Sequence, residues 1–279
     1  MILVTGATGN AGGGVVNGLL ERGADVRGLV RQGSDDLPDG VVAAPGDLND
    51  PDSLHGPLEG VSAVFLLSGY EGLERTLELM RDAGVERVVL LSSSAAPTEN
   101  LDNAVARYHI LSERAVHDSG LPWTFLRPNS FMANALRWRD QLERGDVVRA
   151  QFPEVAVATI DPRDIAEVAV RAFTEDGHTD QAYRLTGPVA LTPPEQVEIL
   201  GRALGRPLRC HGMSRAETHD ELHASMPAPY AAAFESFFAD GTVDETSVTG
   251  TVETVTGHPP RTFEQWTIDN AALFTRAAE

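Results

Sequence analysis

The sequence predicts an α/β fold with a doubly wound parallel sheet of the Rossmann type, followed by a smaller α+β lobe. Short apolar segments alternate with segments of helical periodicity over residues 1–175, and a glycine-rich stretch separates the first two. Parallel strands need crossover helices and are buried on both faces, so their sequences are almost continuously apolar. We expect the Rossmann domain to span residues 1–180 and the lobe residues 181–279, with parts of 130–155 included in the lobe.

The individual elements follow from periodicity and from turn residues. Leu73, Leu77 and Met80 show the spacing of a helix face, and Pro45-Gly46-Asp47 closes an apolar strand. We expect strands at 2–5, 25–31, 41–44, 63–67, 87–91, 123–127 and 156–160, and helices at 12–22, 52–58, 71–83, 103–119 and 164–174. In the lobe we expect a strand at 183–185 and helices at 194–204 and 215–239. The lobe is expected to cover the carboxyl ends of the sheet strands.

The charge balance argues against a nucleic-acid partner. The 279 residues include 22 Lys and Arg against 41 Asp and Glu, a formal net charge of −19, which repels phosphate backbones. The most basic stretch, Arg137 to Arg149, alternates with acidic residues and is predicted to be a solvated helix face. No apolar run approaches the roughly 18 residues of a membrane span.

The cysteine content and the N-terminal residues favour a cytoplasmic protein. The chain starts on the apolar MILV, without the basic leader of a signal peptide. Cys210 is the single cysteine, which excludes an internal disulfide and a cysteine-based zinc site, and we interpret it as unreactive. We expect no metal site.

The segment Thr5 to Gly12 has the spacing G-x-x-G-x-x-G between the first predicted strand and the first predicted helix. This context is typical of a dinucleotide-binding loop, in which glycines permit a tight turn, close approach of the pyrophosphate and close helix packing. The helix N-terminus attracts the phosphates. The predicted phosphate-binding residues are Gly6, Ala7, Thr8, Gly9, Asn10, Ala11 and Gly12.

Arg31 at the end of the second strand favours NADP(H) over NAD(H). NAD(H)-dependent proteins usually place an acidic residue there, which would repel a 2′-phosphate, whereas a guanidinium binds that phosphate. The alternative is that Arg31 pairs with Asp35 or Asp36, in the loop that also holds Gly33 and Ser34. Asp47, after the third strand, is expected to accept from the adenine amino group.

The sequence resembles the NmrA-like branch of the atypical short-chain dehydrogenase/reductases over residues 1–175. The matching segments are TGATGNAG at 5–12, LVR at 29–31, GDL at 46–48, VFLLSG at 64–69, VVLLSSS at 88–94, HILSERAVHDSGLPWTFLRPNSFMAN at 109–134 and DPRDIA at 161–166. The resemblance implies that the dinucleotide also contacts Leu48, Leu67, Ser68, Gly69 and the Arg127-Pro128 strand end.

The proton donor of the wider superfamily is missing. Its Tyr-x-x-x-Lys pair is replaced by Val105 and His109 when the register is counted back from Glu113, a match to a family helix acid. Tyr108 lies one residue off this register and is interpreted as a packing residue. His109 either contacts the nicotinamide ribose, acts as the acid, or is a structural helix histidine. Ser94 is at the position of the superfamily's catalytic serine, although a turn hydroxyl explains it equally well.

The residues after the sixth strand are predicted to face the nicotinamide. Phe131 and Met132 are expected to be substrate-pocket walls or, alternatively, core between the lobes, and Asn129 and Asn134 are expected in the same pocket. The leading hypothesis is an NADPH-dependent oxidoreductase that passes hydride to a small electron-poor acceptor, such as a quinone or a conjugated carbonyl. The alternatives are a non-catalytic NADP(H) sensor, with a regulatory protein partner, and a reductase or isomerase for one biosynthetic intermediate. A homo-oligomer is compatible with each of them.

Overall fold

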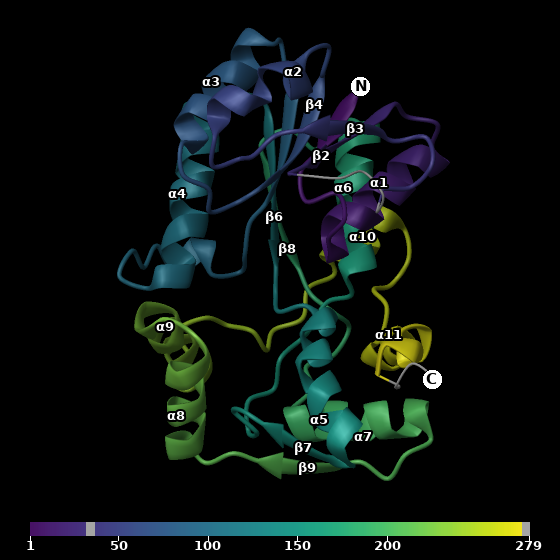
Figure 1. The fold of residues 1–279 in the computed structure, drawn as a ribbon, viewed down its shortest axis with the longest axis vertical. Coiled ribbons are helices and arrows are strands. Elements are labelled where there is room, and N and C mark those ends of the chain that lie inside the picture. The colour runs from purple at the N-terminus through teal and green to yellow at the C-terminus, as the bar shows by residue number, and fades with distance from the viewer. Residues whose placement is uncertain (32–36, 275–279) are drawn as a thin grey trace.

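The fold is a seven-stranded parallel sheet between two layers of helices, with a smaller lobe below it (Figure 1). The computed structural model describes residues 1–31 and 37–274. The strand order is β3-β2-β1-β4-β5-β6-β8. The strands are β1 Ile2–Val4, β2 Val26–Val30, β3 Val42–Pro45, β4 Ala63–Leu67, β5 Arg87–Leu91, β6 Trp123–Pro128 and β8 Gln181–Leu185. The predicted fold class is confirmed.

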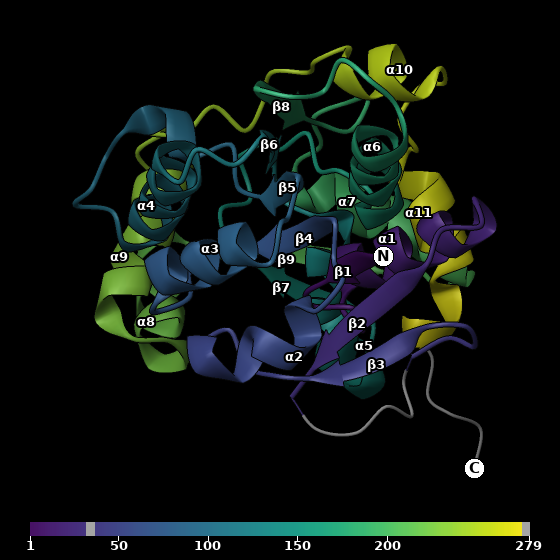
Figure 2. The same ribbon diagram turned by 90° about the horizontal axis from the view of Figure 1, so that it is seen from above.

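Helices cover both faces of the sheet (Figure 2). One face carries α1 Asn10–Glu21, α6 Pro162–Thr174 and α10 Thr251–Thr256; the other carries the 3₁₀ turn Pro51–Leu54, α2 His55–Leu58, α3 Leu73–Asp82 and α4 Ala104–Asp118. Successive strand residues join opposite cores: Val64 packs with the α3 side and Phe65 with the α1 side. The strands are almost continuously apolar because both of their faces are buried.

Two glycines let α1 lie close against α6. A Cβ on Gly14 would lie 2.7 Å from Cβ of Ala166, and one on Gly18 would lie 3.0 Å from Cγ2 of Val170. This packing fixes α1, and with it the phosphate loop at its N-terminus, relative to the sheet.

The structure corrects two predictions about strands. β8 pairs in parallel with β6, so the strand that we had assigned to the lobe completes the main sheet. Residues 156–160 form no strand: the N–H groups of Val157, Ala158 and Ile160 donate to Leu191, Glu245 and Ser130, respectively. Because these acceptors belong to three separate segments, no continuous ladder forms.

The small lobe has its own core and its own two-stranded parallel sheet. β7 Val147–Ala150 pairs with β9 Arg209–Gly212. The helices are the 3₁₀ helices Met132–Trp138 and Ala271–Phe274, together with α5 Arg139–Arg144, α7 Pro193–Leu204, α8 Arg215–Ser225, α9 Ala228–Phe238 and α11 Phe263–Asp269. The 3₁₀ helix Ala96–Thr98 instead follows β5 and packs against α4. Trp138, Phe263 and Trp266 are buried at the centre of this core. The lobe therefore combines residues 132–150 with later segments.

Two helix predictions in the lobe were wrong. The segment Arg137 to Arg149 is not one solvated helix, because Trp138, Leu142 and Val148 are buried and the chain turns into β7. The predicted helix 215–239 is broken between α8 and α9 at Pro227, whose ring prevents continuation of α8. In β9, Cys210 is half-buried, and burial raises the pKa of its thiol, in agreement with an unreactive cysteine. Among the described residues, no helix combines the length and hydropathy needed to cross a membrane.

Candidate active site

The phosphate loop has the backbone geometry that its glycines predict. Gly6 adopts φ +61°, and the Gly9 N–H donates to its carbonyl at 2.9 Å. A Cβ on Gly12 would lie 2.1 Å from that same carbonyl oxygen, a distance that no side chain can occupy. Gly6 therefore makes the turn, and Gly12 allows α1 to start directly against it.

The first turn of α1 is open to an anion. Its N-cap residue is Gly9, which supplies no side-chain hydrogen bond, and the first turn contains no acidic residue. Thr8, Gly9 and Asn10 are exposed. The first N–H groups of a helix lack intrahelical acceptors and carry the positive end of its dipole. These features fit the pyrophosphate of a dinucleotide.

Arg31 and Asp47 lie on the β2–β3 side of this loop. Arg31 directly follows β2 and is exposed, and among the described residues no carboxylate pairs with it. The alternative partners Asp35 and Asp36 lie outside the described residues. Asp47 accepts through Oδ1 from the backbone and side chain of Asn49, and Leu48 beside it is buried.

The end of β4 approaches α4 closely. Ser68 donates to the carbonyl of Leu91, and the N–H of Gly69 donates to Oγ of Ser112 at 3.1 Å. A Cβ on Gly69 would lie 2.9 Å from the Tyr108 ring. Burial raises the pKa of the Tyr108 phenol, which stays protonated, and its ring packs against the turn.

A cavity of about 380 Å³ opens at the carboxyl ends of β4, β5 and β6, and we call it the strand-end cavity. It is lined by Leu67, Ser68, Tyr70, Leu91, Ser92, Ser93, Ser94, Ala95, Val105, Tyr108, His109, Pro128, Asn129, Ser130, Phe131, Asn134, Phe234, Phe237, Phe238, Val243 and Glu245. Nδ1 of His109 and Oδ1 of Asn129 are buried and have no hydrogen-bond partner within residues 1–31 and 37–274. Buried polar atoms are normally paired, so these two fit the polar part of a bound ligand.

His109 is not suited to the acid role considered above. Burial lowers the pKa of its imidazole to about 3, so the ring is neutral at physiological pH. A neutral imidazole can still hydrogen-bond to a ribose or a carboxamide through its ring nitrogens. The remaining predicted roles are therefore a cofactor contact or a structural helix histidine.

A buried carboxyl group that the sequence did not reveal lies beside Ser94. Glu245 accepts from the Ser94 hydroxyl, and its other oxygen accepts from the Ser130 N–H at 2.8 Å. Asn129 Nδ2 donates to the Glu245 carbonyl at 3.0 Å. Burial raises the pKa of the Glu245 carboxyl, although both hydrogen bonds oppose the shift. No signal in the sequence separates Glu245 from other acidic residues, since it lies 151 positions after Ser94.

Glu113 has a positioning role behind the cavity. Its carboxylate accepts two bonds from the Arg127 guanidinium, at 2.9 and 2.6 Å, and one from Ser92 at 2.6 Å. These bonds tie α4 to the ends of β5 and β6. The side chains of α4 that face the cavity, including His109, are thereby held in place.

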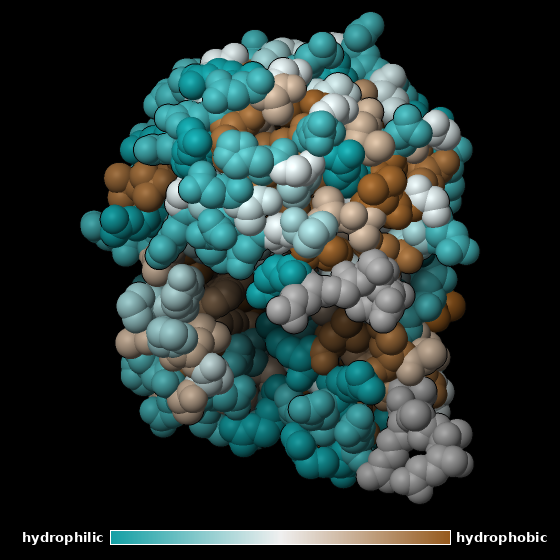
Figure 3. Space-filling model, turned by 45° about the horizontal axis from the view of Figure 1, so that its top comes forward, coloured by the Kyte–Doolittle hydropathy of each residue, from teal (hydrophilic) through white to brown (hydrophobic). Residues whose placement is uncertain are grey.

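A second cavity of about 350 Å³ adjoins the first inside the small lobe, and we call it the lobe cavity. The two share Ser130, Phe131, Asn134, Phe234 and Phe238. Figure 3 shows a recess with apolar walls between the upper and lower parts of the molecule. Phe131 and Asn134 thus lie where a substrate pocket was predicted. Met132 does not lie in this pocket, because it is buried in the lobe core and lines neither cavity. This agrees with the alternative interpretation of Met132 as a core residue.

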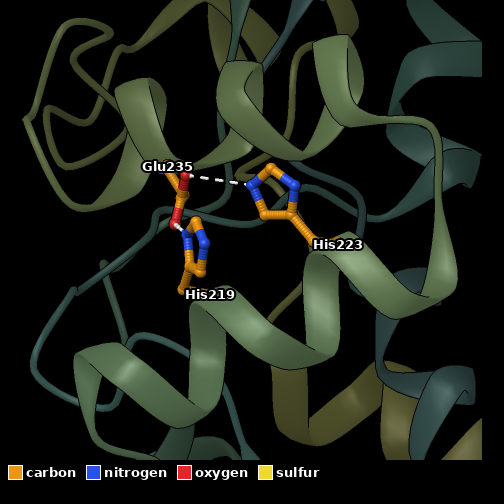
Figure 4. A group of neighbouring side chains, drawn as sticks. All are labelled: His219, His223 and Glu235. Carbon is orange, nitrogen blue, oxygen red and sulfur yellow. Dashed lines mark hydrogen bonds and ion pairs between the residues drawn. The ribbon is translucent and has the colours of Figure 1, made fainter.

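The helices α8 and α9 form one wall of the lobe cavity and are joined by histidine–carboxylate pairs (Figure 4). His219 Nδ1 lies 2.8 Å from Glu235 Oε1, and His223 Nε2 lies 3.6 Å from Oε2. The three ligand atoms lie within 4.8 Å of one another and form a potential metal-binding group. The spacing His-x-x-x-His on a helix is the signal that the sequence analysis had not used. In the structure these contacts link α8 to α9.

Comparison with known proteins identifies the family. The sequence profile of the NAD(P)H-binding family matches residues 6–176. The chain belongs to this family. Across 98% of its length it is 40% identical to the (4-alkanoyl-5-oxo-2,5-dihydrofuran-3-yl)methyl phosphate reductase of Streptomyces griseus, of which the match covers 99%. It is 34% identical to the NAD(P)H azoreductase of Xenophilus azovorans, over 99% of this chain and 100% of that protein.

A solved reductase structure is also similar to this chain in fold and in sequence. The triphenylmethane reductase of Citrobacter sp., complexed with NADP(H), superposes with a TM-score of 0.80 at 25% identity, covering 97% of this chain and 100% of that one. Together the comparisons confirm the predictions of an atypical short-chain dehydrogenase/reductase, of nicotinamide dinucleotide binding and of an oxidoreductase.

Proposed function

We propose that this member of the NAD(P)H-binding family uses NADPH to reduce a small conjugated, electron-poor acceptor in the lobe cavity. The observation that carries the proposal is the junction of two cavities: one lies at the strand ends, where the phosphate loop directs the coenzyme, and the other opens from it into the lobe. The family places a nicotinamide dinucleotide in the Rossmann domain. When bound, NADPH supplies a hydride.

The class of acceptor is supported by the relatives. The Streptomyces reductase is named for a lactone conjugated with a carbonyl group, and the other two for azo compounds and triphenylmethane. The conjugated lactone and the azo group are planar, electron-poor groups that can accept a hydride. The first name supports the hypothesis of a reductase for one biosynthetic intermediate within the same reaction type.

The residues of the chain have distinct proposed roles. The first turn of α1 binds the pyrophosphate, and Arg31 binds the 2′-phosphate. His109 and Asn129 contact the nicotinamide half through their unpartnered atoms. Phe131 and Phe234 exclude water from the junction between the cavities. The single cysteine and the need for reduced coenzyme favour a cytoplasmic location.

A carbonyl or enone acceptor also needs a proton, and Glu245 with Ser94 is the proposed source. Burial keeps the Glu245 carboxyl protonated at a higher pH than an exposed carboxyl. In the transfer, the protonated Glu245 carboxyl gives its proton to Ser94 Oγ while the Ser94 hydroxyl proton goes to the acceptor, which leaves a Glu245 carboxylate that accepts from Ser94. The missing Tyr-x-x-x-Lys pair is replaced, in this proposal, by a serine–glutamate pair.

The test is steady-state oxidation of NADPH and NADH with a panel of acceptors: 1,4-naphthoquinone, an α,β-unsaturated lactone and an azo dye. We expect turnover with at least one acceptor and a preference for NADPH. Tight NADPH binding without oxidation by any acceptor would instead favour the sensor hypothesis, for which partner affinity should change between NADP⁺ and NADPH.

A further inference from the structure

Arg137 occupies an unusual position for a charged side chain. It follows the β6 strand end on the 3₁₀ helix Met132–Trp138 and lines the lobe cavity. Its guanidinium carbon lies 5.4 Å from the centre of the Trp138 ring. Other walls of this cavity are formed by Phe131, Phe152 and Val157. The guanidinium therefore lies at a cavity whose walls are both apolar and polar, since Gln141 and Gln151 also line it.

The charge of Arg137 is not neutralised by the protein. Among the described residues, no carboxylate lies within 4.0 Å of its guanidinium, and no hydrogen-bond acceptor is paired with it. Arg149, the other arginine lining this cavity, does face a carboxylate, that of Glu217 at 3.6 Å. Glu221 acts on Arg137 only at longer range, and its Oε1 accepts from Gln151.

The side chain of Arg137 is exposed, and it lines the lobe cavity. The protein atoms that surround its guanidinium lower the pKa of this group by partial desolvation, and the charge of Glu221 opposes the shift. A guanidinium that lines a cavity and has no carboxylate partner there can form charge-assisted hydrogen bonds with an anion. With a formal net charge of −19, the protein as a whole repels anions, so a local cation is needed to hold one.

We propose that Arg137 binds an anionic oxygen group, a phosphate monoester or a carboxylate, carried by the acceptor. The planar guanidinium can form two parallel hydrogen bonds with either group, and its central carbon lies over the Trp138 ring. The conjugated part of the same acceptor then lies toward Phe131 and Asn134, the residues that both cavities share. This inference rests on the proposed function and specifies the substrate class of that site.

The turnover test compares a neutral and an anionic acceptor, 1,4-naphthoquinone and its 2-sulfonate. Arg137→Gln should lower kcat/KM for the sulfonate at least tenfold, chiefly through KM, and change kcat/KM for the neutral quinone less than threefold. Arg137→Lys, which keeps the charge, should recover part of the loss. The matched control is Arg139→Gln, an exposed arginine two positions on that does not line the cavity. Equal losses with both quinones, or no loss with either, would overturn the proposal.

A binding test separates this inference from the reductase function. With NADP⁺ saturating the phosphate loop, phenyl phosphate should raise the Tm of the wild-type protein and of Arg139→Gln, but not of Arg137→Gln, whereas phenol should have no effect. No shift with wild-type protein would refute the anion site even if quinones are reduced. A shift that depends on Arg137, without turnover of any acceptor, would support the anion site and refute the reductase function.

Discussion

The phosphate loop occupies consecutive residues from Thr5 to Gly12, whereas the lobe cavity takes its lining from segments spread between Ser130 and Phe238. In the proposed coenzyme site, the loop offers backbone N–H groups, whose arrangement depends on local φ angles and on glycine spacing. The cavity depends on side chains that the fold brings together from the 3₁₀ helix Met132–Trp138, α7, α8 and α9. The coenzyme site is therefore sensitive to single added atoms, and the acceptor site to the charge and shape of particular side chains.

The largest effect is expected for Gly12→Ala in the loop. Its Cβ would lie 2.1 Å from the Gly6 carbonyl oxygen, so the start of α1 must shift away from the turn. We expect NADPH affinity to fall about a thousandfold, or about 4 kcal/mol. Titration calorimetry measures the loss, with circular dichroism to check the fold.

The matched control is Gly13→Ala, one residue along the same helix. There a Cβ would lie 3.4 Å from the Ala7 carbonyl oxygen, an ordinary contact, and NADPH affinity should stay close to that of the wild type. Similar affinities for the two variants would contradict the role given to Gly12.

The next effect is expected on the acceptor side, from Glu245→Gln. Removing a general acid typically lowers kcat about a hundredfold, and we expect this for a carbonyl acceptor at acidic pH. In the wild type, kcat should fall as the pH rises through the raised pKa of Glu245, because the carboxyl loses its proton; the variant should lack this limb. Parallel pH profiles for the two proteins would argue against the proton role.

Glu245→Gln should also change how the stability of the protein depends on pH. The folded-state pKa of Glu245 is raised, so its contribution to stability is fully present below the unfolded-state pKa and is lost as the pH rises through the folded-state value. The Tm of the wild type relative to Glu245→Gln should therefore decrease with rising pH. A constant difference would indicate that the carboxyl does not titrate in this range.

A smaller effect is expected for Arg31→Ala, which tests coenzyme choice. Loss of a charge-assisted contact with the 2′-phosphate should weaken NADPH binding about tenfold, or about 1.4 kcal/mol, and leave NADH binding unchanged. The control is Arg75→Ala on α3, whose guanidinium pairs with Glu78 at 3.0 Å on the surface. Equal weakening of NADPH and NADH would remove the case for a 2′-phosphate contact.

The smallest effects are expected for substitutions of Met132 and Phe131, which are adjacent in the chain but have different proposed roles. Met132→Leu conserves volume in the lobe core and should change the free energy of unfolding by less than about 1.5 kcal/mol, without changing KM for the acceptor. Phe131→Leu alters a wall shared by the two cavities and should raise that KM severalfold. A larger KM change for Met132→Leu than for Phe131→Leu would indicate that Met132, and not Phe131, is the wall of the acceptor pocket.

The sequence by itself determined the parallel sheet, the phosphate loop and the class of coenzyme. These features depend on local patterns: apolar strands, helix periodicity and the glycines at positions 6, 9 and 12. Even there, a segment such as 156–160 had the apolar character of a strand without its pairing, because pairing requires a partner strand in register.

Only the tertiary structure decided the chemistry of the acceptor site. The same histidine that has a pKa near 6.5 in water is neutral at position 109 because helix and strand residues exclude water from it. Glu245 acquires its proposed role through burial and through neighbours far away in the chain, and Arg137 through the cavity that distant segments form beside it. Burial and electrostatic interaction depend on distance in space, and a linear pattern of residues does not contain that distance.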